Sequence, residues 1–219
     1  MTGMDEEGGL REIRSMALLM AHDLRNMFSV LNGLVILVER RNEPRHLEMM
    51  KKQLDLCEQV VSSFVRLAEE GRSVRGSISL GPLISALVES MHFPENVVVE
   101  LSPGLSGNAL CDPGQIRQIL WNLLANAADA CGTEPACVRV STQEKDGFVC
   151  IQVEDTGQGI SPEVREHLME RPVTTKTAGM GLGLYLSRRM AETNGGRLEF
   201  ESREGPGTRF SLWLPEAKS

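Results

Sequence analysis

The first seventy residues carry a repeating pattern of apolar positions. From Leu10 onward the spacing alternates between three and four residues over four heptads, at positions 10, 13, 17, 20, 24, 27, 31, 34 and 38. This pattern predicts a long helix with a coiled-coil seam. Pro44 disfavours a helical conformation in the residue before it, so we expect the first helix to end within RRNEP, residues 40–44. A second series at 47, 50, 54, 57, 61, 64 and 68 predicts a second helix and therefore a helical hairpin.

Additional apolar residues lie beside both seams. They are more numerous than a pair of helices would cover, and include Leu18, Leu19, Phe28, Val35, Met49, Val60 and Val65. Two hairpins packed as a four-helix bundle would bury them. We therefore expect the chain to form a homodimer.

The pattern changes after GRSVRGSIS, residues 71–79, which is polar and rich in Gly and Ser and is typical of a linker or domain boundary. Beyond it, five segments have the composition of strands, with a hairpin turn expected at 145–147, and three segments have helical patterns. The strands are expected at 97–101, 136–142, 147–155, 196–202 and 208–215, and the helices near 81–92, 113–131 and 181–194. The sequence thus predicts an α+β protein: a helical hairpin domain at 1–74, and at 75–219 an α/β sandwich whose sheet is covered on one face.

Composition limits the function classes. The net charge is −7 and the 23 Lys and Arg residues form no basic stripe, which argues against a nucleic-acid partner. The five cysteines are widely spaced and lack a CxxC pair, so the sequence indicates neither a disulfide framework nor a zinc site, and it fits a reducing cytoplasm. The longest apolar stretch, 27–38, is interrupted by Asn32 and Gly33 and falls short of the roughly 20 residues of a membrane span. The acidic start MTGMDEEGG also lacks the basic region of a signal peptide.

His22 lies in the motif HDLRN, on the first predicted helix. With Leu10, Ala17, Leu24 and Leu31 at heptad position a, His22 falls at f, farthest from the seam, and Asn26 and Ser29 continue a polar stripe. One interpretation is an ordinary surface histidine. The other is a nucleophile, whose neutral ring nitrogen would be made available by Asp23, which could orient and deprotonate the other nitrogen.

The segment DPGQIRQILWNLLANAADA, residues 112–130, has Asp112 as a helix cap and Pro113 at the first helical position. Asn122, Asn126 and Asp129 share its polar stripe. Two amide oxygens one turn apart suit a magnesium ion that keeps water and phosphate ligands, while a buried amide cap is the alternative interpretation.

Two glycine-rich segments follow. In DTGQGI, residues 155–160, Asp155 ends a predicted strand, and Gly157 and Gly159 would let the backbone pass close to a ligand. In KTAGMGLGLYLSRRMAE, residues 176–192, three glycines precede a helix whose exposed N–H groups would cradle phosphate: Gly179, Gly181 and Gly183. A turn and a glycine hinge are the alternatives. The spacing matches neither the Rossmann fingerprint nor a Walker A loop, since the chain has no GK pair.

The order of these motifs resembles the two-component sensor histidine kinases. HDLRN resembles their phosphoacceptor box, WNLLANAADA their N box, DTGQGI their G1 box and GMGLGL their G2 box. The resemblance extends from about residue 10 to 215. It implies a dimerisation and phosphoacceptor hairpin, followed by an ATP-binding domain of the gyrase, Hsp90 and MutL (GHKL) type.

The resemblance also implies roles for individual residues. His22 would be phosphorylated with Asp23 as its general base, Asn126 would hold Mg²⁺ with Asn122 nearby, and Asp155 would accept a hydrogen bond from the adenine amino group of ATP. Lys176 would contact phosphate, and the remaining nucleotide contacts would come from Gly157, Gly159, Gly179, Gly181 and Gly183. The phosphoryl group would pass to an aspartate of a response regulator receiver domain, and Asn26 would orient water for a regulator phosphatase activity.

The chain departs from the family in two respects. HLMERPVTTK lacks the phenylalanine-containing segment that often precedes TTK in the family, and no sensing domain is evident. Input would then arrive through a separate sensor protein or through residues that this sequence lacks. Two alternative functions remain. One is a histidine phosphotransfer protein that does not use ATP and relays phosphate between regulators, and the other is a serine kinase of the anti-sigma type with the same nucleotide fold.

Overall fold

The computed structural model divides the chain into two compact units, Met1–Arg66 and Leu67–Ser219. It describes residues 21, 24–40, 43–47, 49–51, 53–54, 57, 61, 75–170, 182–202 and 207–217. The domain boundary predicted between residues 74 and 75 stays a prediction. Among the described residues, no helix has both the length and the apolar character to cross a membrane.

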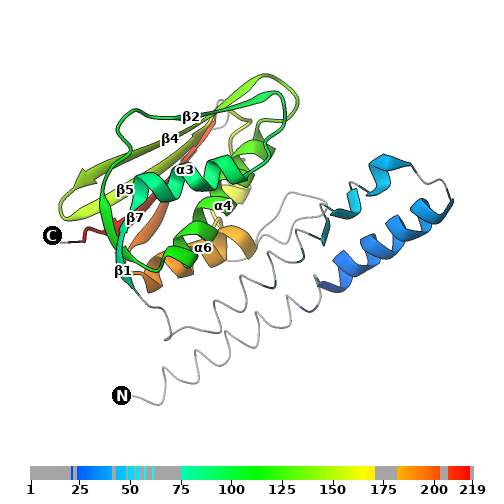
Figure 1. The fold of residues 1–219 in the computed structure, drawn as a ribbon, viewed down its shortest axis with the longest axis horizontal. Coiled ribbons are helices and arrows are strands. Elements are labelled where there is room, and N and C mark those ends of the chain that lie inside the picture. The colour runs from blue at the N-terminus through cyan, green and yellow to red at the C-terminus, as the bar shows by residue number, and fades with distance from the viewer. Residues whose placement is uncertain are drawn as a thin grey trace, which may run out of the picture. The chain divides into compact units, whose positions relative to one another are not determined.

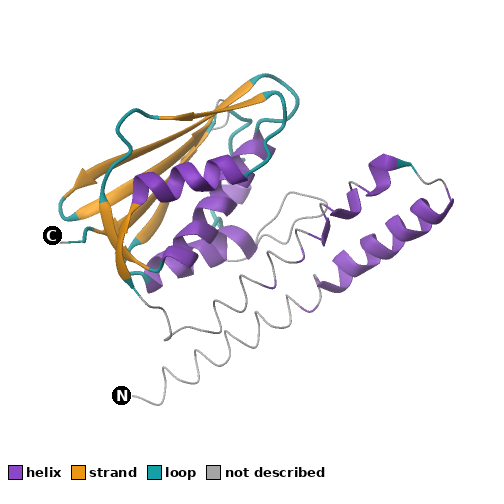
Figure 2. Cartoon of the chain, viewed as in Figure 1, coloured by secondary structure: helices purple, strands orange, loops and turns teal. Residues whose placement is uncertain are grey.

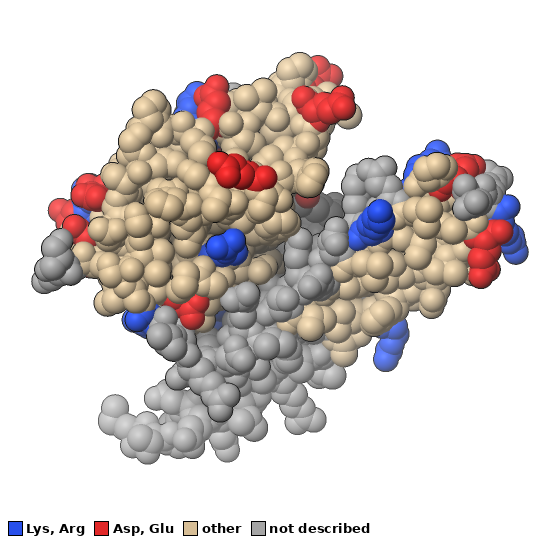
Figure 3. All heavy atoms as spheres, viewed as in Figure 1, with Lys and Arg blue, Asp and Glu red and all other residues tan. Residues whose placement is uncertain are grey.

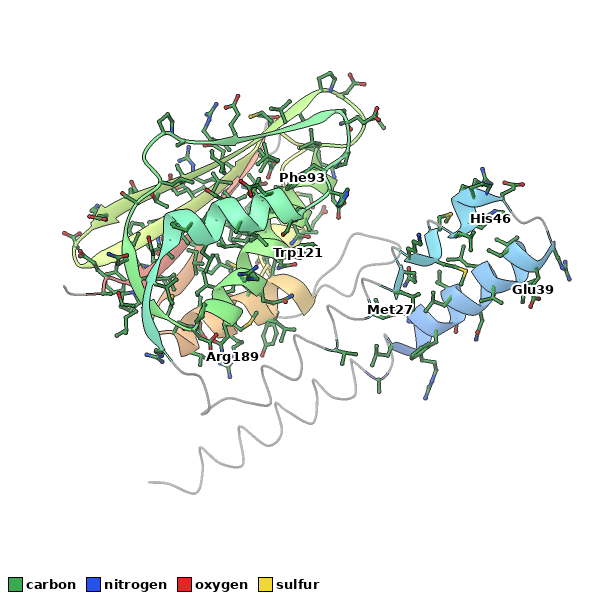
Figure 4. The ribbon with its side chains drawn as sticks, viewed as in Figure 1. Met27, Glu39, His46, Phe93, Trp121 and Arg189 are labelled. Carbon is green, nitrogen blue, oxygen red and sulfur yellow. The ribbon has the colours of Figure 1, made fainter. Side chains whose placement is uncertain are left out.

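The first unit is helical over 24–40 and again at 44–47, 49–51, 53–54, 57 and 61. Met27, Leu31 and Leu34 are 3%, 8% and 5% exposed, as their place in the predicted seam requires. The residues that the pattern placed on the polar side, Asn26 and Ser29, are exposed. Figure 4 marks Met27 and Glu39 on this helix and His46 on the next one.

Within the chain, the buried side of the second helix differs from its predicted seam. His46 and Gln53 are buried, whereas Leu47, Leu54 and Val61 are about half exposed. The residues buried within the chain, His46 and Gln53, each precede a residue of the apolar series by one position. Apolar spacing identifies side chains that need cover, but it does not say whether the same chain or another one covers them.

The second unit is built on a five-stranded sheet with the order β2-β4-β5-β7-β6. Its strands are β2 (Val97–Leu101), β4 (Ala136–Lys145), β5 (Phe148–Asp155), β6 (Arg197–Ser202) and β7 (Thr208–Pro215). β2 runs parallel to β4, and all other neighbours are antiparallel. Asp146 and Gly147, with φ of 52° and 76°, form the predicted tight turn between β4 and β5, because two positive φ angles match the twist of a two-residue hairpin.

Three helices lie on one side of this sheet (Figures 1 and 2): α3 (Leu80–Ser90), α4 (Pro113–Ala130) and α6 (Leu182–Thr193). The strands alternate in burial, most regularly in β7, so every second side chain enters the layer between sheet and helices. The largest fully buried side chains come from both layers and include Leu80, Ile84, Ile116, Ile119, Leu123, Ile151, Leu212 and Leu214. These observations confirm the predicted mixed α+β fold with a sheet covered by helices.

Three short elements were not predicted: β1 (Gly76–Ser79), β3 (Asn108–Cys111) and α5 (Pro162–Arg165). β1 and β3 pair antiparallel as a separate small sheet. The segment 71–79, predicted as a linker, therefore contains a strand from residue 76. Four residues are too few for a clear alternation, and the partner strand lies some thirty positions away. On the face drawn in Figure 3, acidic and basic side chains of the described residues stand singly or in small groups on a mostly uncharged surface.

Candidate functional site

Asp155 is the last residue of β5 and is only 5% exposed. Its Oδ1 accepts hydrogen bonds from the backbone N–H of Gly157 (2.8 Å) and of Thr208 (3.2 Å). Burial raises the pKa of the Asp155 carboxyl, and these two N–H donors act in the opposite direction. Oδ2 makes no hydrogen bond with any described residue. The site therefore holds a buried carboxylate with one oxygen fixed by the backbone and one oxygen left to accept another donor.

The loop after β5 passes very close to the end of α4. A Cβ on Gly157 would collide with the carbonyl oxygen of Ala130 and lie 2.6 Å from its carbon. The N–H of Gln158 donates to that same oxygen at 3.1 Å, and Gly159 has a φ of +74°. Gly157 and Gly159 thus shape a tight turn, which was the alternative interpretation of this segment, and the turn is fastened to the last residue of α4.

Sequence reasoning missed the contribution of Thr208 at the start of β7. Thr208 is 4% exposed, and its hydroxyl lies 3.1 Å from that of Ser202, which in turn accepts from the N–H of Ile160. The N–H of Gly207 donates to the carbonyl of Gly157 at 2.8 Å. The loop that carries Gly157 is therefore held from two sides. The available signal was the GPGT run directly before the last predicted strand.

α4 presents the two asparagines of the predicted site. Asp112 caps the helix by accepting from the N–H groups of Gly114 and Gln115, as the sequence predicted. Ten residues after this cap, Asn122 donates through Nδ2 to Oγ of Ser187 at 3.0 Å. Asn126 donates through Nδ2 to Oδ1 of Asn122 at 3.3 Å. The two amides are therefore adjacent, and Asn122 is joined to α6.

Gly183, in the first turn of α6, lies directly against Asn122. A Cβ at this position would collide with the Asn122 amide, whose Cγ would be only 2.9 Å away. The structure therefore brings Gly183 to the asparagine pair on α4. Gly179, Gly181 and Lys176 lie outside the described residues, as do His22 and Asp23 of the first unit. Asn26 is described and exposed in that unit.

A second polar cluster ties the beginning of α4 to the end of α6. Asn194 is fully buried; its Nδ2 donates to Oε1 of Gln115 and to the carbonyl of Met190, each at 2.7 Å. Its Oδ1 accepts from the N–H of Asp112 at 2.8 Å. Sequence reasoning did not find Asn194. Buried amides whose hydrogen bonds are all made define one arrangement of the elements that they join.

The donor set fits a nucleotide better than a metal ion held by protein alone. Among the described residues, no group of three or more His, Cys, Asp or Glu side chains is placed to hold a metal. Asn126 offers a neutral amide oxygen, which suits Mg²⁺ when phosphate and water supply the other ligands. Asp155 offers a carboxylate oxygen, which suits an amino group.

Comparison with known proteins agrees with this geometry. Residues 111–218 match the family described as histidine kinase-, DNA gyrase B- and HSP90-like ATPase. The sensor histidine kinase ZraS of Escherichia coli O157:H7 is 31% identical over 205 residues, covering 89% of this chain and 44% of that protein. The sensory histidine kinase/phosphatase NtrB of the same organism is 31% identical over 216 residues, covering 91% of this chain and 61% of that protein.

A solved structure extends the similarity in fold over most of the chain. The Acinetobacter baumannii histidine kinase AdeS superposes with a TM-score of 0.68 at 18% identity, covering 90% of this chain and 98% of the other. The chain spans less than half the length of ZraS. Residues 111–218 therefore form a domain of the histidine kinase-, DNA gyrase B- and HSP90-like ATPase family, and about nine tenths of the chain is similar in sequence to sensor histidine kinases.

Proposed function

We propose that this chain is an ATP-dependent protein-histidine kinase that phosphorylates its own His22 and passes the phosphoryl group to an aspartate of a response regulator receiver domain. The observation that carries the proposal is the buried carboxylate of Asp155. One of its oxygens is held by the N–H groups of Gly157 and Thr208. The other is an acceptor in a site that is almost closed to water, since Asp155 is 5% exposed. This arrangement complements the exocyclic amino group of adenine, which is a donor.

The phosphate end of the nucleotide is expected along α4 and the start of α6. Asn126 would hold Mg²⁺ through its amide oxygen, with Asn122 beside it. When bound, Mg²⁺ would neutralise charge on the phosphates. Lys176, Gly179 and Gly181 precede α6 and are expected to line the phosphates, together with Gly183. In phosphoryl transfer, positioning and electrostatic stabilisation of this kind supply most of the catalysis.

His22 and Asp23 supply the acceptor side of the reaction. A ring nitrogen of neutral His22 would form a bond to the terminal phosphorus of ATP while the bond to the ADP oxygen breaks. Asp23 would take the proton from the other ring nitrogen, so the imidazole does not carry a positive charge after the transfer. In the second step the phosphoryl group would move from this nitrogen to a carboxylate oxygen of the regulator.

The first unit has the surface that a homodimer would need. Its described helices expose several large apolar side chains: Phe28, Val30, Val35, Ile36, Leu37, Leu47, Met49, Leu54 and Val61. Leu47, Leu54 and Val61 recur at intervals of seven residues, which is the spacing of a helix packed in a bundle. These exposed residues support a four-helix bundle made by two copies of the chain.

Incubation of the purified chain with γ-³²P-labelled ATP and Mg²⁺ tests the proposal. We expect a protein label that is stable to alkali and lost in acid, and that is absent from the variants His22→Ala and Asp155→Asn. A label that survives in His22→Ala would contradict the assignment of the acceptor. A chain that binds no ATP, yet exchanges phosphoryl groups with a phosphorylated receiver domain, would instead be the phosphotransfer protein that does not use ATP.

The phosphatase activity rests on Asn26. This amide is exposed one helical turn after His22, where it could orient a water molecule against a regulator's phosphoaspartate. We expect Asn26→Ala to keep autophosphorylation and to lose the ability to speed dephosphorylation of a regulator. Equal dephosphorylation by Asn26→Ala and the unaltered chain would remove Asn26 from that reaction.

A further inference from the structure

Three polar side chains form a continuous line of hydrogen bonds from α6 into α4. Ser187 is fully buried, and its Oγ accepts from Nδ2 of Asn122 at 3.0 Å. Oδ1 of Asn122 accepts from Nδ2 of Asn126 at 3.3 Å. Asn122 therefore uses both ends of its amide inside the protein, and this makes it a link between two helices rather than a group extended toward a ligand.

The packing of α6 supports the same view. Gly183 and Ser187 are four residues apart and so share one face of the helix. The Asn122 amide lies against this face, because any Cβ on Gly183 would collide with it. Gly183 thus provides the room for the Asn122 amide, and Ser187 provides its hydrogen-bond acceptor.

The line of hydrogen bonds has a direction. A carboxamide has a donor end and an acceptor end of nearly the same shape, and its partners decide which way it faces. A serine hydroxyl can accept or donate, so Ser187 holds the Asn122 amide in place without alone choosing its direction. With Ser187 accepting from Nδ2 of Asn122, Oδ1 of Asn122 faces Asn126. Asn126 turns its own Nδ2 toward Asn122, so Oδ1 of Asn126 lies on the side of the Asn126 carboxamide that faces away from Asn122. An amide oxygen is a ligand for Mg²⁺, whereas the NH₂ end is not.

We propose that Ser187 is a positioning residue for the magnesium ligand: acting through Asn122, it holds the place at which Asn126 presents its amide oxygen. This inference rests on the proposed function, since it assumes that Asn126 binds Mg²⁺ with ATP. Because Ser187 is fully buried, we assign it no contact with the nucleotide or the metal ion. It couples the position of α6 to the metal affinity of α4.

The test measures binding by calorimetry on the full chain, without any phosphorylation assay. The probe is AMP-PNP, titrated once with excess Mg²⁺ and once with EDTA, and the readout is the ratio of the two dissociation constants. We expect Ser187→Ala to reduce the gain in affinity due to Mg²⁺ by about 10- to 100-fold, which is the usual effect of removing a group that positions a metal ligand. If the gain in the unaltered chain is smaller than this, we expect the variant to lose it completely. The dissociation constant in EDTA is expected to change by less than about twofold, because the hydrogen bonds of Asp155 come from Gly157 and Thr208 and not from this line of side chains.

Two further variants separate positioning from general packing. Ser187→Cys keeps the size of the side chain but offers a weak acceptor, so an intermediate ratio is expected. Met190→Leu changes a buried residue of the same helix that has no polar side-chain group, and we expect the ratio of the unaltered chain. An unchanged ratio in Ser187→Ala would overturn the proposal, as would an equal loss in Met190→Leu. Affinity of the unaltered chain that does not depend on Mg²⁺ would also overturn it, whereas no binding of AMP-PNP at all would instead reject the proposed function.

Discussion

Replacing Gly157 by Ala tests the close approach between the loop after β5 and the end of α4. The added Cβ would lie 2.6 Å from the carbonyl carbon of Ala130, which is about 1 Å short of the roughly 3.5–4.0 Å that carbon atoms prefer. The atoms that it meets are mainly backbone at the last residue of a helix, so they have no alternative rotamer. The loop must therefore move by about that distance.

Such a movement would disturb two hydrogen bonds. Gly157 donates to Oδ1 of Asp155 at 2.8 Å, and Gln158 donates to the carbonyl of Ala130 at 3.1 Å. Inserting a methyl group into a packed site costs about 1–3 kcal/mol, and a hydrogen bond to a charged group contributes about 1.5–3 kcal/mol. Because the loop would relax in part, we expect Gly157→Ala to lower the free energy of unfolding by about 2–4 kcal/mol. We also expect it to weaken binding of AMP-PNP.

Urea denaturation followed by tryptophan fluorescence measures this free energy. Both tryptophans, Trp121 and Trp213, lie in the second unit, so the signal reports the unit that carries the substitution. Gly76→Ala is the matched control, because a Cβ at Gly76 meets no atom within 4 Å and its φ is not positive. We expect this control to stay within about 0.5–1 kcal/mol of the unaltered chain. Equal stability and equal AMP-PNP affinity in the two variants would refute the reasoning that the loop is fixed by close contact.

Two further predictions concern buried polar groups. Asp155→Asn should bind no AMP-PNP, yet should unfold at pH 7 with a free energy equal to or above that of the unaltered chain. Burial raises the pKa of the Asp155 carboxyl above its ordinary value of 3.8. Its favourable contribution to the free energy of unfolding is therefore complete below pH 3.8 and is lost as the pH rises through the folded-state pKa. Denaturation curves at several pH values should show this loss of stability in the unaltered chain and not in Asp155→Asn. Asn194→Ala should lower the free energy of unfolding by about 2–4 kcal/mol, because it leaves Oε1 of Gln115 and the N–H of Asp112 without their partner. The control Asn96→Ala, which removes two exposed hydrogen bonds, should cost clearly less in the same urea titration, and equal losses would contradict the role of burial.

The sequence predicted those elements whose evidence is local. β2 and β7 have the predicted bounds, 97–101 and 208–215, and α4 differs from its prediction by one residue at its end. In each case a run of five residues or more alternates or repeats in hydropathy, or a cap and a proline mark the start. Asp155, Gly157 and Gly159 could be assigned to a site for a similar reason, since a carboxylate at a strand end followed by spaced glycines is itself a local pattern.

The residues that were missed depend on contacts between distant parts of the chain. Ser187 reaches Asn122 across 65 positions, Thr208 reaches Asp155 across 53, and Asn194 reaches Asp112 across 82. Nothing in the neighbourhood of a buried serine or asparagine identifies its partner, because the hydrogen bond is decided by how the elements pack. The second helix shows the same limit of local evidence. Leu47 and Leu54 are apolar and need cover, but within the chain the inward side carries His46 and Gln53.

Two of the missed contacts lie on α4, and together with its last residue they show how separate motifs could form one candidate site. At its start, α4 is tied to the end of α6 through Asp112 and Asn194. In its middle it is tied to α6 again through Asn122, and its last residue, Ala130, accepts from the loop that follows Asp155. The carboxylate expected to meet adenine and the amide expected to meet magnesium are thus both positioned against the same 18-residue helix. Because one rigid element sets both ends, a substitution that shifts α4 along its axis should weaken adenine recognition and magnesium-dependent affinity together, whereas a change confined to Ser187 should affect only the second.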